Sequence, residues 1–225
     1  MGEIEVRRGG ERFVSRAEGR ETRYSFSYAE HYDATNTHHG LLLAHNDESL
    51  APGAGYAEHP HRGLEIATWV IEGTLTHRDS SSTSREVPAG WLQLMSAGRG
   101  MTHSETNEQP VPVRYVQMWV VPDGSRDEPS YALHELEAGP LTDALVPPGQ
   151  PDAAFVVARP DTAGLDLPDA AYLHLFVANG SVDLGGVGRL DAGDAVRLHA
   201  AGPLHLTGEP GAAVGMWVMQ RSPGG

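Results

Sequence analysis

Hydrophobic residues along this chain occur in short runs, not at the spacing of one helix face. Residues 63–73 are rich in β-branched and aromatic side chains and are bounded by glycines, which is typical of a strand. Residues 73–79, 88–95 and 113–121 repeat the pattern, with turn-forming residues between them about every ten positions. No stretch of helical periodicity has comparable strength. The pattern predicts a mostly β protein, organised as a sandwich or barrel.

The second half of the chain repeats features of the first half. Residues 172–178 have the character of a strand, Asn179-Gly180 that of a tight hairpin turn, and residues 181–184 that of the returning strand. The turn sequence x-Ala-Gly-x recurs in residues 87–93 and 190–196, each time after a hairpin and before an apolar strand. We interpret this recurrence as an internal duplication of one β-barrel unit.

The duplication predicts two barrels and a connector between them. The predicted N-terminal barrel spans residues 1–125, the connector residues 126–152, and the C-terminal barrel residues 153–225. Prolines and acidic residues mark the connector, in which one crossing strand is expected at residues 130–136. The prolines in and just before it are Pro122, Pro129, Pro140, Pro147, Pro148 and Pro151.

The composition excludes several classes of function. Thirty acidic residues against 16 basic ones give a formal net charge of −14, which repels phosphate backbones and disfavours direct nucleic-acid binding. The chain contains no cysteine, so disulfides, thiolate metal sites and cysteine nucleophiles are excluded. No apolar run approaches the ~18 residues of a membrane-spanning helix, and the N-terminus lacks a signal-peptide core. We therefore expect a cytoplasmic protein with no membrane segment.

Two short motifs, His59-Pro-His61 and His103-Ser-Glu105, place metal-binding residue types at alternate positions. Alternate side chains of a strand share one face, so each motif directs two donors to the same side. Two such strands that face one another inside a barrel can bring four donors to one ion. Neutral imidazole and carboxylate suit iron, manganese, nickel, copper, cobalt or zinc, and this donor set leaves two positions of an octahedron open.

Three stretches of the first half carry a family resemblance. They are residues 59–66 (His-Pro-His-Arg-Gly-Leu-Glu-Ile), 72–80 (Glu-Gly-Thr-Leu-Thr-His-Arg-Asp-Ser) and 95–105 (Met-Ser-Ala-Gly-Arg-Gly-Met-Thr-His-Ser-Glu). Together they resemble the pirin family of bicupins. The resemblance implies two jelly-roll barrels of the cupin type, a metal in the N-terminal barrel only and, in some members, quercetin 2,3-dioxygenase activity. We expect one divalent ion per chain, with iron favoured over zinc, manganese, nickel, copper and cobalt.

The identity of the carboxylate ligand depends on the choice between Glu65 and Glu105. Glu65 has the same strand parity as His59 and His61, so it also points into the barrel if the strand continues unbroken. The pirin-like pattern instead takes its carboxylate from the second motif, which makes Glu105 the expected ligand and Glu65 a residue beside the ligands. We also expect Glu105 to be the catalytic base if it loosens from the metal.

The remaining histidines carry weaker signals. His77 is expected to pair with Asp79 at the surface, and a position beside the metal ligands is the alternative. His174, His199 and His205 lie in the second barrel without a paired donor, so no metal is expected there.

Three functions remain open at this stage. The first is a metal-dependent dioxygenase that opens flavonols such as quercetin with dioxygen, in which Glu105 accepts the substrate's hydroxyl proton. The second is a non-catalytic metal- or redox-sensing protein that acts through a protein partner. The third is a storage or structural metal protein without turnover. Oxygen-dependent loss of quercetin separates the first function from the other two.

Overall fold

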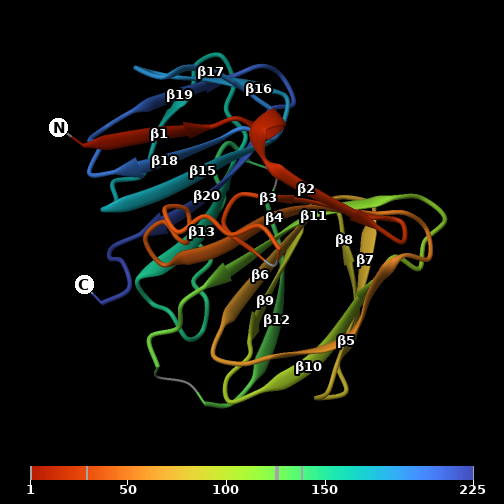
Figure 1. Ribbon diagram of the computed structural model, residues 1–225. Coiled ribbons are helices and arrows are strands. Elements are labelled where there is room, and N and C mark those ends of the chain that lie inside the picture. Colours follow the sequence, from red (N-terminus) through yellow and green to blue (C-terminus); the bar gives the residue numbers. More distant parts are fainter. Residues whose placement is uncertain (1, 29, 125–126, 138, 225) are drawn as a thin grey trace.

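The computed structural model describes residues 2–28, 30–124, 127–137 and 139–224, and these form an almost entirely β structure. Within these residues, twenty strands lie in four antiparallel sheets, and one short 3-10 helix, η1 (Gly9–Glu11), follows the first strand. Figure 1 shows two units, one above the other, each built from a larger and a smaller sheet. The all-β prediction is therefore confirmed. Across the described residues, no helix has the length and apolar character needed to cross a membrane.

The first unit contains the strands that carry both histidine motifs. Its larger sheet has the order β12 (Ser130–Glu135), β9 (Trp91–Ser96), β6 (Glu65–Glu72), β11 (Val113–Val120), β4 (Leu42–Leu50), β3 (Arg20–Tyr24) and β2 (Phe13–Ala17). Its smaller sheet has the order β5 (Gly55–His61), β10 (Met101–Thr106), β7 (Thr74–Asp79) and β8 (Ser84–Pro88). The side chains between the two sheets are apolar at one end of the unit and polar at the other, where the motifs lie.

The second unit repeats this arrangement. Its larger sheet has the order β1 (Glu3–Arg7), β18 (Ala195–His199), β15 (Tyr172–Asn179), β20 (Ala213–Met219) and β13 (Ala153–Ala158). Its smaller sheet has the order β14 (Leu165–Asp166), β19 (His205–Gly208), β16 (Ser181–Leu184) and β17 (Gly188–Asp191). β15 lies between β18 and β20 as β6 lies between β9 and β11, and β16 lies between β17 and β19 as β7 lies between β8 and β10. The topology thus shows the duplication that the sequence pattern predicts.

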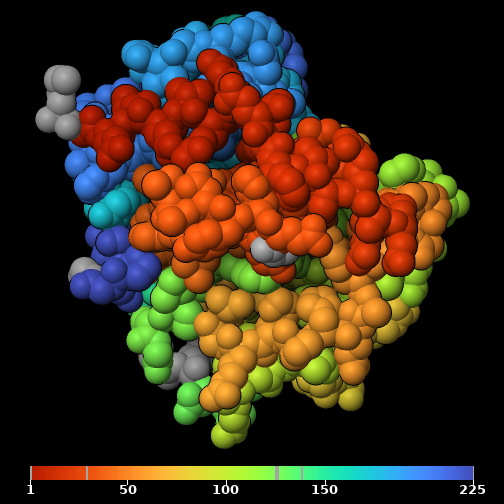
Figure 2. All heavy atoms as spheres, viewed as in Figure 1, coloured from red at the N-terminus to blue at the C-terminus, as the bar shows by residue number. Residues whose placement is uncertain are grey.

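One strand departs from the expected division of the chain. Residues 3–7, which the sequence assigns to the N-terminal barrel, form β1 and pair with β18 of the second unit. The alternating sequence Glu-Ile-Glu-Val-Arg explains this, because it lets Val6 pack against the apolar core of the second unit. The chain then crosses to β2 in the first unit, and Figure 2 shows this N-terminal segment, in red, running over both units. The strand expected at residues 130–136 is β12, while the boundaries at residues 125 and 152 stay predictions.

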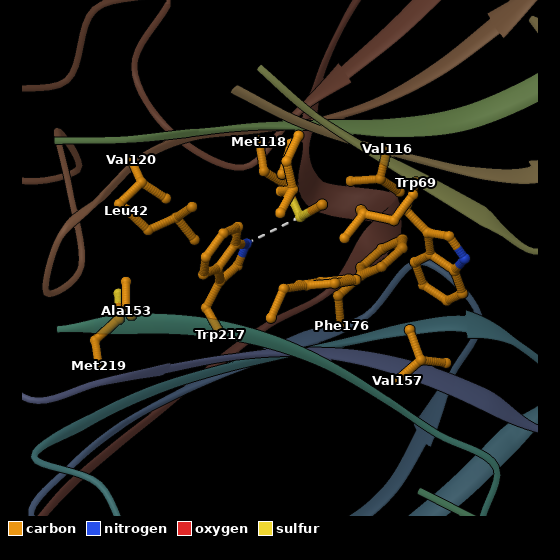
Figure 3. Close-up of a cluster of buried hydrophobic side chains, with 14 of the residues drawn as sticks. Leu42, Trp69, Val116, Met118, Val120, Ala153, Val157, Phe176, Trp217 and Met219 are labelled. Atoms are coloured by element: carbon orange, nitrogen blue, oxygen red, sulfur yellow. Dashed lines mark hydrogen bonds between the residues drawn. The ribbon is translucent and has the colours of Figure 1, made fainter. Parts of the chain in front are cut away.

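The two units pack against each other through an apolar layer between their larger sheets (Figure 3). Trp217 of β20 is fully buried in this layer and donates from Nε1 to the sulfur of Met118 in β11 at 3.0 Å. The packing is tight at Gly215, where an added Cβ would lie 2.9 Å from the Phe155 ring and 3.0 Å from the Trp69 ring. Because burial of apolar surface is the main stabilising contribution to folding, this layer holds the two units in a fixed relation.

Candidate metal centre

The two histidine motifs lie on neighbouring strands of one sheet. β5 and β10 pair in antiparallel register with His59 opposite His103 and His61 opposite Met101. The two motif strands are therefore hydrogen-bonded neighbours in the smaller sheet. Directly opposite residues of an antiparallel pair have Cβ atoms about 4.5–5.5 Å apart, so pairing alone brings His59 to His103. β5 is an edge strand, a position that tolerates Pro60 because proline has no N–H to donate.

The three imidazoles form one compact group. Ring centroids are 4.9 Å apart for His59 and His61, 4.5 Å for His59 and His103, and 4.9 Å for His61 and His103. One ring nitrogen from each lies within 4.8 Å of the others. The sequence prediction that these three side chains converge is thus in agreement with the structure.

A tight turn just before β10 directs His103 into this group. Gly98 has φ of +49°, and a Cβ added there would lie 2.2 Å from the carbonyl oxygen of Asp127. Only glycine combines this backbone conformation with so close an approach of another chain segment.

Each of the three imidazoles has a nitrogen without a hydrogen-bond partner among the described residues. His59 donates from Nδ1 to the carbonyl oxygen of Ala57 at 2.8 Å, so its Nε2 carries the lone pair. The Nε2 atoms of His61 and His103 are buried and have no hydrogen-bond partner among the described residues. Buried polar atoms without a partner are rare in folded proteins, and converging imidazole nitrogens are typical metal ligands. These three residues therefore fit a divalent transition metal.

A buried chain of side chains sets the orientation of His103. His77 Nε2 lies 3.2 Å from a carboxylate oxygen of Asp79, and His77 Nδ1 lies 3.5 Å from His103 Nδ1. The carboxylate can only accept, so a neutral His77 donates to Asp79 and accepts from His103, whose Nε2 is then free for a metal. Hydrogen bonds from Ser81 and His77 outweigh the effect of burial and lower the pKa of Asp79. The expected pairing of His77 with Asp79 is present, but its expected surface position is wrong, because both side chains are fully buried.

Two glutamines hold the Glu105 carboxylate. Gln93 of β9 donates to Glu105 Oε1 at 2.8 Å, and Gln117 of β11 donates to Oε2 at 2.6 Å. Each carboxylate oxygen can accept more than one bond, so this arrangement fixes the group and leaves electron pairs available. Glu105 also forms a second potential ligand group with His77 and His103, whose donor atoms lie within 4.8 Å of one another. His103 is common to both groups.

Glu65 lies beside the centre and outside both ligand groups. It accepts a hydrogen bond from the Ser96 hydroxyl at 2.7 Å, and its carboxylate lies against Gly149, where an added Cβ would be 2.4 Å from Oε1. The bend between β5 and β6 breaks the strand parity on which its possible role as a ligand depends.

Burial makes His61 and His103 poor bases. Burial, together with the neighbouring imidazoles, lowers the pKa of His61 to about 4 and that of His103 to about 3. Both rings are therefore neutral at physiological pH, which is the form that binds a metal.

The sequence analysis missed a buried carboxyl group in the same cavity. A cavity of about 120 Å³ is lined by His59, His61 and Glu105 and by Glu48 of β4. Glu48 accepts hydrogen bonds from Thr22 at 2.7 Å and from the Tyr56 hydroxyl at 2.8 Å. Burial raises the pKa of Glu48 to about 7, although both hydrogen bonds oppose the shift. In the sequence, Glu48 stands in the polar run of residues 45–49 (His-Asn-Asp-Glu-Ser), which gives no sign that its side chain is buried.

An aromatic wall borders the cavity. Trp119 packs edge-on against the His61 ring at 5.3 Å and against Tyr28 at 5.3 Å, and Tyr28 stacks on Tyr24 at 5.4 Å. All three aromatic residues line the cavity. The site thus combines a metal-binding donor set, a carboxyl group that titrates near neutral pH and an apolar aromatic surface.

The family model of pirin matches residues 7–120. A protein of Mycobacterium tuberculosis named "putative quercetin 2,3-dioxygenase" is 43% identical over 233 residues, covering 96% of this chain and 95% of the relative. The chain belongs to the pirin family. A bacterial pirin from Escherichia coli, YhhW, solved in complex with nickel(II), has a TM-score of 0.89 at 25% identity, covering 97% of this chain and 100% of that one. The quercetin 2,3-dioxygenase of Escherichia coli is 34% identical over 60% of this chain and 58% of its own length.

Among the described residues of the second barrel, no group of potential ligands corresponds to the histidine centre. The strands that correspond to β5 and β10 are β14 and β19, where His205 pairs with Asp166 at 2.8 Å on the surface. In the described part of the chain, both potential ligand groups lie in the first unit. Restriction of the metal to the N-terminal barrel stays a prediction.

Proposed function

We propose that this protein is a metal-dependent dioxygenase that opens flavonols such as quercetin. His59, His61, His103 and Glu105 would hold a single divalent ion. The observation that carries the proposal is the convergence of free imidazole nitrogens, with two of the three Nε2 atoms buried and unpartnered, beside an aromatic cavity that contains a titratable carboxyl group. The names of the relatives and the nickel complex of an Escherichia coli pirin support it.

A divalent ion at this position would supply Lewis acidity to the adjacent hydroxyl and carbonyl oxygens of a flavonol. The protein supplies orientation and proton transfer. Gln93 and Gln117 fix the direction of the Glu105 carboxylate, and the Asp79–His77 pair fixes the His103 ring. Preorganised donors of this kind avoid reorganisation during the reaction.

Two carboxyl groups can accept the substrate's hydroxyl proton. The sequence predicts Glu105 for this step, and the structure adds Glu48, which lines the same cavity. A general base works best when its pKa is close to the working pH, and the pKa of Glu48 is raised to about 7. We propose that Glu48 takes this proton and that the Tyr56 hydroxyl, its hydrogen-bond donor, keeps the carboxylate in place.

The cavity volume restricts how a flavonol could bind. Pockets that enclose a drug-sized ligand have volumes of about 300–1,000 Å³, whereas this cavity has about 120 Å³. We therefore propose that only the hydroxy-ketone edge of the substrate enters. The remaining rings would then lie on the surface formed by Tyr24, Tyr28 and Trp119.

The test is aerobic and anaerobic incubation of metal-loaded protein with quercetin, followed by flavonol absorbance and dioxygen uptake. We expect quercetin and dioxygen to be consumed in equimolar amounts in air, and no loss of quercetin without oxygen. Glu48→Gln should lower kcat and remove the rise in rate around pH ~7, while Glu135→Gln, an exposed change on β12, should leave the profile unchanged. Failure of metal-loaded wild-type protein to consume dioxygen with quercetin would contradict the proposal.

The small cavity also favours a second candidate, a metal- or redox-sensing protein that acts through a protein partner. Such a protein needs the ligand group but no space for an organic substrate. It would bind metal with the same residues and show no turnover, and its binding to a partner would change with the oxidation state of the ion.

A further inference from the structure

A second polar cavity lies between the two units, and it shares no lining residue with the cavity at the histidines. Its volume is about 400 Å³. Its walls are formed by residues 9–10 of η1, the turn at residues 192–193, and charged side chains of β3, β4 and β11. Arg12, which lies where the N-terminal segment crosses between units, completes the lining.

Arg12 is the unusual residue of this cavity. Its three guanidinium nitrogens are buried, and none has a hydrogen-bond partner among the described residues. The guanidinium lies over the Phe176 ring, 5.0 Å from the ring centroid. Burial lowers the pKa of Arg12 to about 10, with Asp47 and Asp194 acting in the opposite direction, so the group stays charged at neutral pH.

The two carboxylates that act electrostatically on Arg12 are those of Asp47 and Asp194, and both are already paired with other cations. Asp47 accepts two hydrogen bonds from Arg114, at 3.0 and 2.9 Å. Asp194 accepts from Arg8 at 2.6 Å and from the Gly9 backbone at 2.8 Å. Arg12 therefore carries a buried charge that no carboxylate of the described residues contacts, and such a charge is costly unless an anion neutralises it.

The cavity as a whole carries a positive excess. Three arginines line it, against two acidic residues, which gives a formal charge of +1. One of these acids, Glu21, is paired with Arg23 at 2.7 Å. A guanidinium fork matches the planar oxygens of a carboxylate or a phosphate group, and the volume falls within the range of small-molecule sites.

We infer that this cavity binds a small anion that carries a carboxylate or phosphate group, with Arg12 as its counter-charge and Arg23 and Arg114 beside it. The inference does not depend on the proposed dioxygenase function. The occupant joins the N-terminal segment to both units, so its binding stabilises the junction between them.

The experiment is isothermal titration of the purified, metal-loaded protein with inorganic phosphate and, separately, with citrate. The variants are Arg12→Gln and, as a matched loss of one positive charge, Arg85→Gln on β8 in the small sheet of the first unit. We expect one saturable site in the wild type, affinity reduced roughly tenfold or more by Arg12→Gln, and unchanged affinity in Arg85→Gln. The phosphate and citrate titrations show which of the two anion classes the cavity prefers.

Thermal melts without added anion separate a binding role from a structural one. If Arg12 binds an anion, its replacement removes an uncompensated buried charge, so the melting temperature of Arg12→Gln should not fall below that of the wild type. The melting temperature of the variant should also no longer rise when phosphate or citrate is added. If Arg12 is a structural element, Arg12→Gln melts lower and keeps the wild-type anion response, which overturns the inference.

Crystals of the wild type soaked in selenate provide a measurement that needs no variant. The expected anomalous peak lies in this cavity beside Arg12. The inference would be overturned if selenate peaks appeared only at the histidine centre or on the outer surface. It would also be overturned if the anion titrations did not saturate and chloride gave the same signal.

Discussion

Replacement of Glu48 by glutamine should change how the stability of the protein depends on pH. Glutamine has nearly the shape of a protonated glutamate and keeps an oxygen that can accept from Thr22 and Tyr56. The wild-type carboxyl has its pKa raised from 4.5 to about 7 by burial. At 1.36 kcal/mol per pKa unit, the ionised form in the folded state costs about 3 kcal/mol relative to the unfolded chain.

The sign follows from proton binding. Between pH ~4.5 and ~7, the folded protein holds a proton on Glu48 that the unfolded chain has lost, so the free energy of unfolding falls as pH rises through this window. Glu48→Gln removes this dependence. Relative to wild type, the variant should gain about 2.5 kcal/mol of stability between pH ~5 and ~8.

The assay is urea unfolding of chelator-treated wild type, Glu48→Gln and the exposed control Glu135→Gln at both pH values. Histidines titrate in every variant, so their contribution cancels when the variants are compared. The control should follow wild type at both values. A stability difference between wild type and Glu48→Gln that is the same at pH ~5 and ~8 would refute the argument that Glu48 is a buried, protonatable group.

Three further predictions concern the metal ligands. Glu105→Ala should lower metal retention far more than Glu65→Ala, since Glu65 lies outside both ligand groups; equal losses in equilibrium dialysis would count against Glu105. His77→Ala should weaken metal affinity by about 10–100-fold, because it removes the residue that orients His103, and an unchanged affinity would show that the Asp79–His77 pair has no such role. With the pKa of His61 at about 4 and that of His103 at about 3, the imidazole signals of these two residues in the metal-free protein should not titrate between pH ~7 and ~5 in an NMR titration, and midpoints at the ordinary imidazole value of ~6.5 would contradict these shifts.

The sequence contained the ligands but not their surroundings. The histidine pairs could be recognised because alternation along a strand is a local property, visible within three residues. Gln93 and Gln117 act on Glu105 from two other strands, β9 and β11, so only the register of the larger sheet reveals them. The role of Glu48 could not be predicted either, because its pKa is raised by burial and burial is not visible in the local sequence.

The duplication and the strands of the second unit were also visible in the sequence, since turn residues and β-branched runs are local signals. The pairing of β1 with the second unit was not visible in the sequence. Its partner β18 lies about 190 residues away, and β1 could have paired with many other strand edges. Burial of His77 and Asp79 was missed for a similar reason. A His-x-Asp pair on an isolated strand suggests a surface ion pair, and the covering aromatic ring of Tyr131 comes from β12, more than fifty residues later.

The central claim is that one divalent metal is held by the first barrel through His59, His61, His103 and Glu105. Anomalous diffraction from crystals of the metal-loaded protein, recorded on either side of the absorption edge of the metal, tests it most directly. The account predicts a single peak per chain, contacted by the Nε2 atoms of the three histidines and by the Glu105 carboxylate. A peak bound by Glu65 in place of Glu105, or a second equivalent peak in the C-terminal barrel, would contradict it.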